Sequence, residues 1–213
     1  MEKYLSDLAA RYPALDGTIP PLRTLIGDTV ALFRRGGTLF VAGNGGSAAD
    51  AEHICGELLK GFKSRRKLSE DDKRKFTGTA GEEGKQLADT LQYGLPAISL
   101  LSHPALSSAF ANDCDPLSVF AQQLWALGRA DDMVIGISTG GGAENIRRLF
   151  IAARAKRIRT VLLTGAKNGR CREFADLVVA APDTETYRIQ ELHLPLYHTL
   201  CLAVESHFFE MTE

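Results

Sequence analysis

Short apolar runs alternate along the chain with longer segments in which apolar residues recur every three or four positions. The runs predict five strands, at residues 38–42, 97–101, 132–137, 160–164 and 177–180. Each run is nearly continuous, which is typical of a strand buried on both faces of a parallel sheet. Because a helical pattern follows each strand, we expect an α/β fold with three layers around a five-stranded parallel sheet.

The helical patterns complete a single domain over residues 1–213. They fall at 2–12, 22–35, 48–59, 104–110, 117–127, 144–156, 169–175 and 186–210. The first two precede the sheet and are interpreted as an N-terminal helical arm over residues 1–36. Asn112 and Asp113 predict a turn, and Trp125 is placed on the apolar face of its helix.

Residues 62–95 differ from the rest of the chain because charged residues of both signs dominate them. Ser69 starts a sequence that is typical of a helix N-terminus, and a second short helix is expected at 82–92. We interpret this segment as a solvent-exposed helical insert that could act as a lid. Its mixed charges argue against nucleic-acid binding.

The composition is consistent with the predicted α/β domain and argues against several kinds of partner. Of 213 residues, 45% are hydrophobic, and 25 basic residues nearly balance 26 acidic ones to give a net charge of −1. We therefore expect no nucleic-acid partner, and no apolar run approaches the roughly 20 residues that cross a membrane. The four cysteines form no CxxC pair and are expected to be reduced, buried thiols of a cytoplasmic protein. The charged N-terminus does not resemble a signal peptide.

The first strand runs into a glycine-rich turn, Gly43-Asn44-Gly45-Gly46-Ser47, at the start of a helix. Backbone N–H groups at the helix N-terminus and the side chains of Asn44 and Ser47 could bind an anion, phosphate above all. A tight turn that binds nothing is the alternative. Through Ala48 the turn also fits the dinucleotide fingerprint GxGxxA, but residues 101–103 lack the acidic residue that this fingerprint expects after the second strand.

A second glycine turn, Ser138-Thr139-Gly140-Gly141-Gly142, follows the third strand. It offers two hydroxyls and several N–H groups, although it could also be a flexible loop that binds nothing. Ligands of parallel sheets bind beyond the carboxyl ends of the strands, so we expect both turns to face one crevice. Two such turns favour a phosphorylated small molecule rather than a nucleotide.

His53 and Glu57 lie four residues apart on the helix behind the first turn, so they share one face of it. Such a pair could bind a divalent metal or act as an acid and a base. It could also be an ordinary surface pair. Its position close to the glycine turn favours a functional role.

The last helical pattern is apolar nearly all round and is expected to be buried. It carries Gln190 and His198, which lie about 80° apart on a helical wheel and can serve one site. His193 lies on the other side of Gln190 and is interpreted as a core histidine held by a hydrogen bond. Pro195 is expected to kink the helix or break it.

Three segments together resemble the sugar isomerase (SIS) domain family and, within it, the phosphoheptose isomerases. They are residues 42–53, 136–139 and 188–193, in the order of the family. The resemblance covers nearly the whole chain outside the charged insert. It implies a flavodoxin-like sheet and a homotetramer whose active sites are shared between subunits.

The resemblance also implies an enzyme that interconverts sedoheptulose 7-phosphate and D-glycero-D-manno-heptose 7-phosphate, an aldose–ketose isomerisation. The family binds one zinc ion per subunit, through residues that match His53, Glu57, Gln190 and His198. Glu57 and His198 also match its proposed acid/base pair. We take as substrate-binding candidates Asn44, Gly45, Gly46, Ser47, Asn112, Asp113, Ser138, Thr139, Gly140 and Gln190.

The chain departs from the family at three points near the site, one of which is Tyr187 in place of an aspartate before Arg188. The family's phosphate turn reads Ser-Thr-Ser-Gly-Asn-Ser, so residues 138–143 lack two of its hydroxyls and an amide. An arginine of the family is Gly61 here, and Lys60 or Lys63 could replace its charge. A non-catalytic SIS protein, which senses a sugar phosphate or associates with the replication initiator, is therefore the alternative. A nucleotide-binding oxidoreductase is a third, weaker interpretation.

Overall fold

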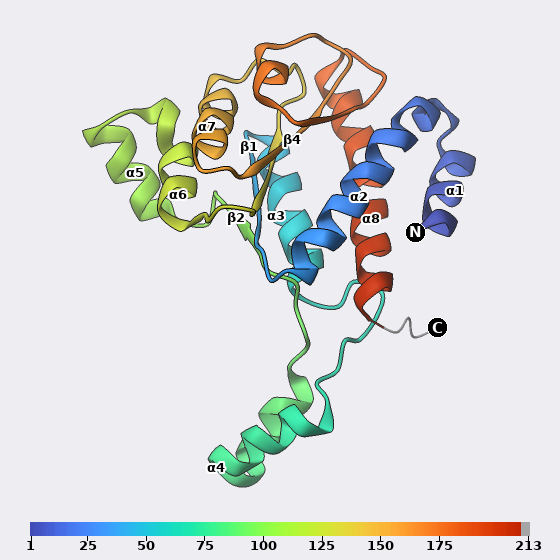
Figure 1. The fold of residues 1–213 in the computed structure, drawn as a ribbon, viewed down its shortest axis with the longest axis vertical. Helices are drawn as coiled ribbons and strands as arrows, with labels where there is room; N and C mark the ends of the chain where they lie inside the picture. The colour runs from blue at the N-terminus through green and yellow to red at the C-terminus, as the bar shows by residue number, and fades with distance from the viewer. Residues whose placement is uncertain (210–213) are drawn as a thin grey trace.

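Five strands form one parallel sheet in the computed structural model, which describes residues 1–209 (Figure 1). They are β1 (Leu39–Gly43), β2 (Ala97–Ser99), β3 (Met133–Ile137), β4 (Arg159–Thr164) and β5 (Leu177–Ala180). Their order is β2-β1-β3-β4-β5, the doubly wound order of flavodoxin-like folds. The predicted α/β class and five-stranded parallel sheet are confirmed, with strand ends within two residues of those expected.

Helices cover both faces of the sheet. The α-helices are α1 (Glu2–Arg11), α2 (Ile19–Arg34), α3 (Gly46–Leu59), α4 (Glu70–Thr90), α5 (Pro104–Asp113), α6 (Val119–Leu127), α7 (Glu144–Ala155) and α8 (Thr186–Phe208), and short 3-10 helices are η1 (Pro13–Thr18), η2 (Pro116–Ser118) and η3 (Arg170–Phe174). Figure 1 shows α2, α3 and α8 together on one side of the sheet and α6 and α7 on the other. Among residues 1–209, no helix has the length and apolar character to cross a bilayer.

Alternate residues of each strand divide the core between the two faces, as the period of two in a strand requires. Leu39 and Val41 of β1 pack in the cluster that includes side chains of α1, α2, α3 and α8. Phe40 and Ala42 pack in the opposite cluster, against α6 and α7. The N-terminal helices belong to the first cluster through residues such as Leu5, so residues 1–36 pack on the body of the domain.

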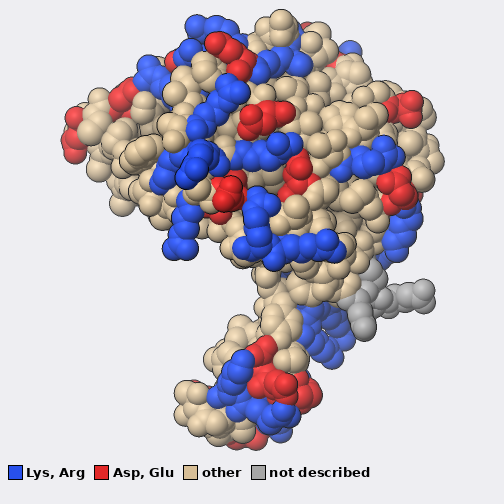
Figure 2. All heavy atoms as spheres, viewed as in Figure 1, with Lys and Arg blue, Asp and Glu red and all other residues tan. Residues whose placement is uncertain are grey.

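The charged insert projects from the body as α4, at the bottom of Figure 1. Ser69 begins it as expected, because its hydroxyl accepts the N–H of Asp72 at 3.2 Å. Gly81, with a φ of +56°, divides α4 into two helical halves. Figure 2 shows basic and acidic side chains intermingled over this projection. The segment is a kinked helix pair in solvent that carries charges of both signs.

Three local predictions are wrong, and a fourth is wrong in part. Asn112 and Asp113 form the end of α5 and not a turn, because α5 continues to Asp113. Trp125 is 54% exposed, since α6 turns other residues toward the core. Helix α8 continues through the buried Pro195, so the helix is not broken there, whereas the expected kink stays a prediction. Cys114 is exposed, whereas the other three cysteines are buried as expected.

Candidate active site

The two glycine turns lie side by side at the carboxyl ends of neighbouring strands β1 and β3. The register pairs Gly43 with Ile137, so both turns begin at the same level of the sheet. Asn44 and Asn145 join them through reciprocal amide hydrogen bonds of 3.0 and 2.8 Å. The strand order reverses here, which is where open α/β sheets bind their ligands. Both turns therefore lie at the same edge of the sheet, and the expectation that they face one crevice stays a prediction.

The first turn exposes Asn44, Gly45 and Gly46 and buries Ser47. Gly45 has a φ of +56°, which glycine adopts at little cost, and it precedes the first residue of α3. The N–H groups of Ser47 and Ala48 already donate to Asn44 O and Gly45 O, at 3.0 Å each. The turn therefore offers an anion fewer free donors than the sequence predicts.

The second turn is braced internally. Ser138 is buried, and its hydroxyl accepts the N–H of Ala143 at 3.4 Å. Gly141 has a φ of +64°, and a Cβ atom at Gly169 would stand 2.1 Å from the Gly141 carbonyl carbon, so no side chain fits at Gly169. Thr139 is half-buried and Gly140 is exposed. The hydroxyl of Ser138 thus stabilises the turn itself, and the exposed backbone at Gly140 is the part open to a ligand.

His53 and Glu57 lie on one face of α3, as predicted. The Nε2 atom of His53 is 3.1 Å from Oε1 of Glu57. The His53 side chain is 42% exposed, whereas that of Glu57 is 14% exposed. The second carboxylate oxygen of Glu57 is buried and has no hydrogen-bond partner. The pair therefore lies at the edge of the body, with a carboxylate oxygen left uncompensated.

Helix α8 brings His198 to this pair. The rings of His198 and His53 have centroids 5.1 Å apart, and those of His198 and Phe62 lie 5.3 Å apart. Burial lowers the pKa of His198, the neighbouring His53 lowers it further, and Glu57 opposes the shift. The Nε2 atom of His198 is buried without a partner. Residues from α3 and α8 that are far apart in the sequence therefore meet as the sequence predicts.

Gln190 lies on the same seam between α3 and α8 but contacts the glycine turn. A Cβ atom at Gly46 would stand 2.5 Å from its Nε2 atom, so the amide rests on the bare Cα of that glycine. His198 follows eight residues later, about 12 Å along the helix axis. His193, between them, is fully buried and its Nε2 atom lies 3.1 Å from the Thr164 carbonyl. The expected core role of His193 is confirmed.

The side chains of His53, Glu57, Gln190 and His198, at the contact between α3 and α8, are of types that bind zinc, although they do not converge on one point. Within residues 1–209, no group of three or more His, Cys, Asp and Glu side chains forms a ready metal cage. Buried polar atoms normally have hydrogen-bond partners, yet both Glu57 Oε2 and His198 Nε2 lack one. Imidazole nitrogens and carboxylate oxygens are usual zinc ligands. These two uncompensated atoms carry the fit to a cation.

The sequence patterns did not predict a buried ion pair at the end of α3. Arg66 and Glu205 are both fully buried at the side chain, with Nε 2.8 Å from Oε1. The guanidinium also donates to the carbonyls of Leu58 (2.6 Å) and Glu57 (3.0 Å), where α3 ends. A helix leaves its last carbonyls without partners, so Arg66 caps the helix that carries His53 and Glu57.

The remaining candidates lie elsewhere in the chain. Asn112 and Asp113 are exposed at the end of α5, where their side chains bond to each other at 2.8 Å. No side chain fits at Gly61, because a Cβ atom there would stand 2.1 Å from the Ser64 carbonyl. Lys60 bends back to the carbonyl of Gly61 at 3.1 Å. The sequence patterns also missed Asn145, which joins the two turns.

Comparison with known proteins extends the likeness beyond the site. No protein-family model matches the chain. The phosphoheptose isomerase of Roseiflexus sp. (strain RS-1) is 38% identical over 191 residues, which are 90% of this chain and 84% of that protein. A solved phosphoheptose isomerase from Francisella tularensis superimposes with a TM-score of 0.76 at 25% identity, covering 96% of this chain and 95% of that one. One from Neisseria gonorrhoeae gives 0.72 at 27% identity, covering 96% and 98%.

Proposed function

The chain belongs to the phosphoheptose isomerase family, and from this premise we propose that it interconverts sedoheptulose 7-phosphate and D-glycero-D-manno-heptose 7-phosphate. It is a phosphosugar isomerase. The heptose, the metal and the residue roles are the parts of the proposal that need tests.

The reaction moves a proton between adjacent carbons through an ene-diol and a second proton between their oxygens. We assign Glu57 as the base that takes the carbon-bound proton and returns it to the neighbouring carbon. His198 is the acid that exchanges a proton with the substrate oxygens. A zinc ion held by His53, Glu57, Gln190 and His198 would supply positive charge next to the developing oxyanion.

We assign the phosphate group to the edge of the sheet at which the two glycine turns meet. Backbone N–H groups there, with the hydroxyl of Thr139, would hold it at a helix N-terminus, where negative charge is favoured. Gln190 faces the same turn through its contact with Gly46. Anchoring the phosphate fixes the reacting carbons relative to Glu57 and His198, which lie further along the seam.

One observation carries the assignment of roles. Glu57 Oε2 and His198 Nε2 are buried, come from different helices and have no partner within the described chain. A buried carboxylate oxygen and imidazole nitrogen without partners are costly for stability and useful for proton transfer.

Glu57→Gln tests the base directly. This change keeps the size of the side chain and removes its ability to take a proton, so the isomerisation rate should fall by at least about 10²-fold. Glu52→Gln, on the exposed face of the same helix, is the matched control and should keep full activity. An E57Q enzyme as active on sedoheptulose 7-phosphate as E52Q would refute the assignment.

Bound metal separates the enzyme from the non-catalytic alternative, which the internally bonded Ser138 favours. After purification with zinc present, elemental analysis should find about one zinc per subunit, and a His53→Ala, His198→Ala variant should lose it. Failure to retain zinc, with sugar-phosphate binding but no turnover, would support the sensor instead.

A homotetramer is also part of the proposal. Helix α5 has no buried residue within the described chain, although it carries apolar side chains such as Leu106 and Phe110. Such a helix gains stability when another subunit covers it. Light scattering on purified protein should give about four times the 23.1 kDa chain mass, and a monomer would exclude shared active sites.

A further inference from the structure

We propose that Asn145 is a positioning residue, which holds the amide of Asn44 in the orientation that binds the phosphate group of the substrate. The inference rests on the proposed function, which assigns the phosphate to the edge of the sheet where the two glycine turns meet. It adds to that site a residue outside both turns, at the start of α7.

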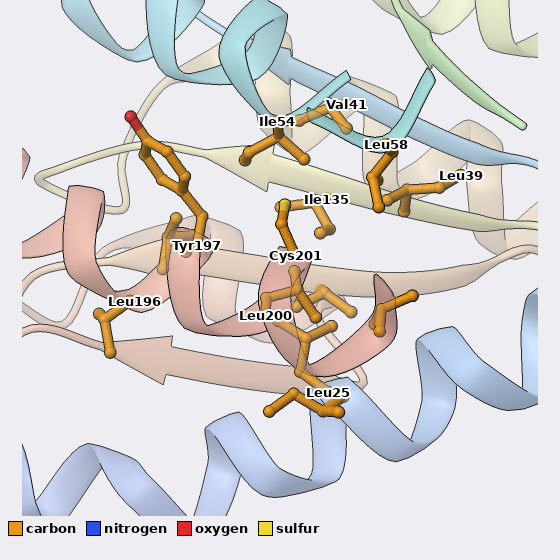
Figure 3. Close-up of a cluster of buried hydrophobic side chains, with 14 of the residues drawn as sticks. Leu25, Leu39, Val41, Ile54, Leu58, Ile135, Leu196, Tyr197, Leu200 and Cys201 are labelled. Carbon is orange, nitrogen blue, oxygen red and sulfur yellow. The ribbon is translucent and has the colours of Figure 1, made fainter. Parts of the chain in front are cut away.

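The strands that carry the two turns are fixed by the hydrophobic core, whereas the tip of the first turn is exposed. Leu39 and Val41 of β1 pack in the same cluster as Ile135 of β3, and Figure 3 shows these side chains within it. Residues 44–46 are exposed beyond the end of β1. The direction of the Asn44 side chain therefore depends on contacts made at the edge of the sheet itself.

Asn145 is the anchored member of the pair. It is half-buried, and its Oδ1 atom accepts the N–H of Ile146 at 3.0 Å. A backbone N–H can only donate, so this bond fixes which end of the amide is the oxygen. The same Oδ1 atom accepts from Nδ2 of Asn44 at 3.0 Å, and Nδ2 of Asn145 donates to Oδ1 of Asn44 at 2.8 Å. The orientation of the exposed amide therefore follows from that of the anchored one.

The pair keeps a donor in place for a ligand. An amide group carries two N–H hydrogens, and the pair uses one from each side chain, so Asn44 has a second to offer an oxyanion. Other donors of the turns are already used, because the N–H of Ser47 donates to Asn44 O and that of Ala143 to the Ser138 hydroxyl. A donor that is oriented before the ligand arrives binds it more tightly than one that must first be ordered.

Asn145→Ser separates this role from support of α7. A serine hydroxyl can still accept an N–H at the start of the helix, but it is too short to reach Asn44. Asn145→Ala removes both contacts. The matched control is Gln86→Ala, which removes an exposed amide on α4. The probes are inorganic phosphate, whose Kd is measured by calorimetry, and sedoheptulose 7-phosphate, for which KM and kcat are measured separately.

Asn145→Ser and Asn145→Ala should each raise the Kd of phosphate and the KM about tenfold, because a hydrogen bond to a charged ligand is misdirected. The kcat should change less than about twofold, since the phosphate is held alike in the ground state and the transition state. Asn44→Ala should have the same effect. The double variant Asn44→Ala, Asn145→Ser should be no weaker than Asn44→Ala alone, because Asn145 acts through Asn44. Gln86→Ala should match the wild type.

Effects that add in the double variant would overturn the inference, as would an unchanged phosphate affinity in Asn145→Ser or a wild type that binds no phosphate. The serine variant decides the matter if Asn145→Ala folds poorly. If phosphate binding depends on Asn145 but no heptose phosphate is isomerised, the inference stands and the proposed function fails.

Discussion

Removing the carboxylate of Glu205 should be among the most destabilising single changes in this chain. Its two oxygens accept four N–H groups, from the side chain of Arg66 and from the backbone of Phe62, Lys63 and Ser64. Three of these bonds are 2.8 Å long and the fourth is 3.2 Å. Both charged side chains are fully shielded from water, so no solvent can take over when one is deleted.

The magnitude follows from that geometry. Breaking a buried ion pair by removing one partner costs about 3–5 kcal/mol, because the other charge stays buried. Glu205→Ala also leaves backbone N–H groups unpaired, at roughly 1–3 kcal/mol each where water cannot reach them. A loss of at least about 4 kcal/mol is therefore expected, against a total stability of about 5–15 kcal/mol for a typical domain. Glu205→Gln keeps one acceptor oxygen and should cost about half as much.

Urea unfolding followed by circular dichroism, at equal protein concentration for all variants, measures the free energy of unfolding. The control is Glu2→Gln, which breaks an exposed ion pair with Arg23 and should leave the stability unchanged. The expected order of loss is Glu205→Ala, then Glu205→Gln, then Glu2→Gln. A Glu205→Ala protein that loses less than about 1 kcal/mol would refute the argument from burial.

Three further predictions follow from other parts of the structure. Burial lowers the pKa of His193 to about 4, against about 6.5 in an unfolded chain, so the folded state binds fewer protons between these values. The free energy of unfolding should therefore fall by up to about 3 kcal/mol as the pH drops through this window, and urea titrations should show that His193→Gln removes this part of the slope while the lowered pKa of His198 still contributes. Gly46→Ala should lower kcat/KM about tenfold or more, because the new methyl group displaces Gln190. The control is Gly56→Ala in the same helix, where the methyl group meets open space. This variant should keep its activity and stabilise α3 by about 0.5–1 kcal/mol. Titration of the thiols in native protein should find one fast-reacting cysteine, Cys114. The Cys114→Ser variant should keep only the three slow thiols. More than one fast thiol in the wild type would contradict the burial of the other cysteines.

Patterns that depend on neighbouring residues could be predicted from the sequence. Continuous apolar runs identified the strands, because a strand covered on both faces has few places for polar side chains. Glycines after β1 and β3 identified the turns, and the spacing of His53 and Glu57 identified one face of α3. The meeting of that face with His198 followed from the family resemblance rather than from periodicity.

Contacts between distant segments could not be predicted in this way. Arg66 lies within a run of basic residues that looks solvent-exposed, and only its contact with Glu205 on α8 explains its burial. The tyrosine at position 197 reads as one more core aromatic until Asp50 and His53 are placed beside its hydroxyl. Trp125 shows the converse, because an apolar position in a helix is exposed when nothing in its own chain packs on it.

The two ends of the projecting segment meet where it leaves the body. Lys67 pairs with Gln92 in an antiparallel bridge, and the N–H of Tyr93 donates to the carbonyl of Arg66 at 2.8 Å. Where the two ends of a loop are held together in this way, the entropic cost of closing the loop grows only slowly with its length. Insertions, deletions or a grafted peptide between these ends should therefore leave the sheet in place. The segment between Lys67 and Gln92 can therefore be replaced, in evolution or by protein engineering, without changes to the rest of the domain.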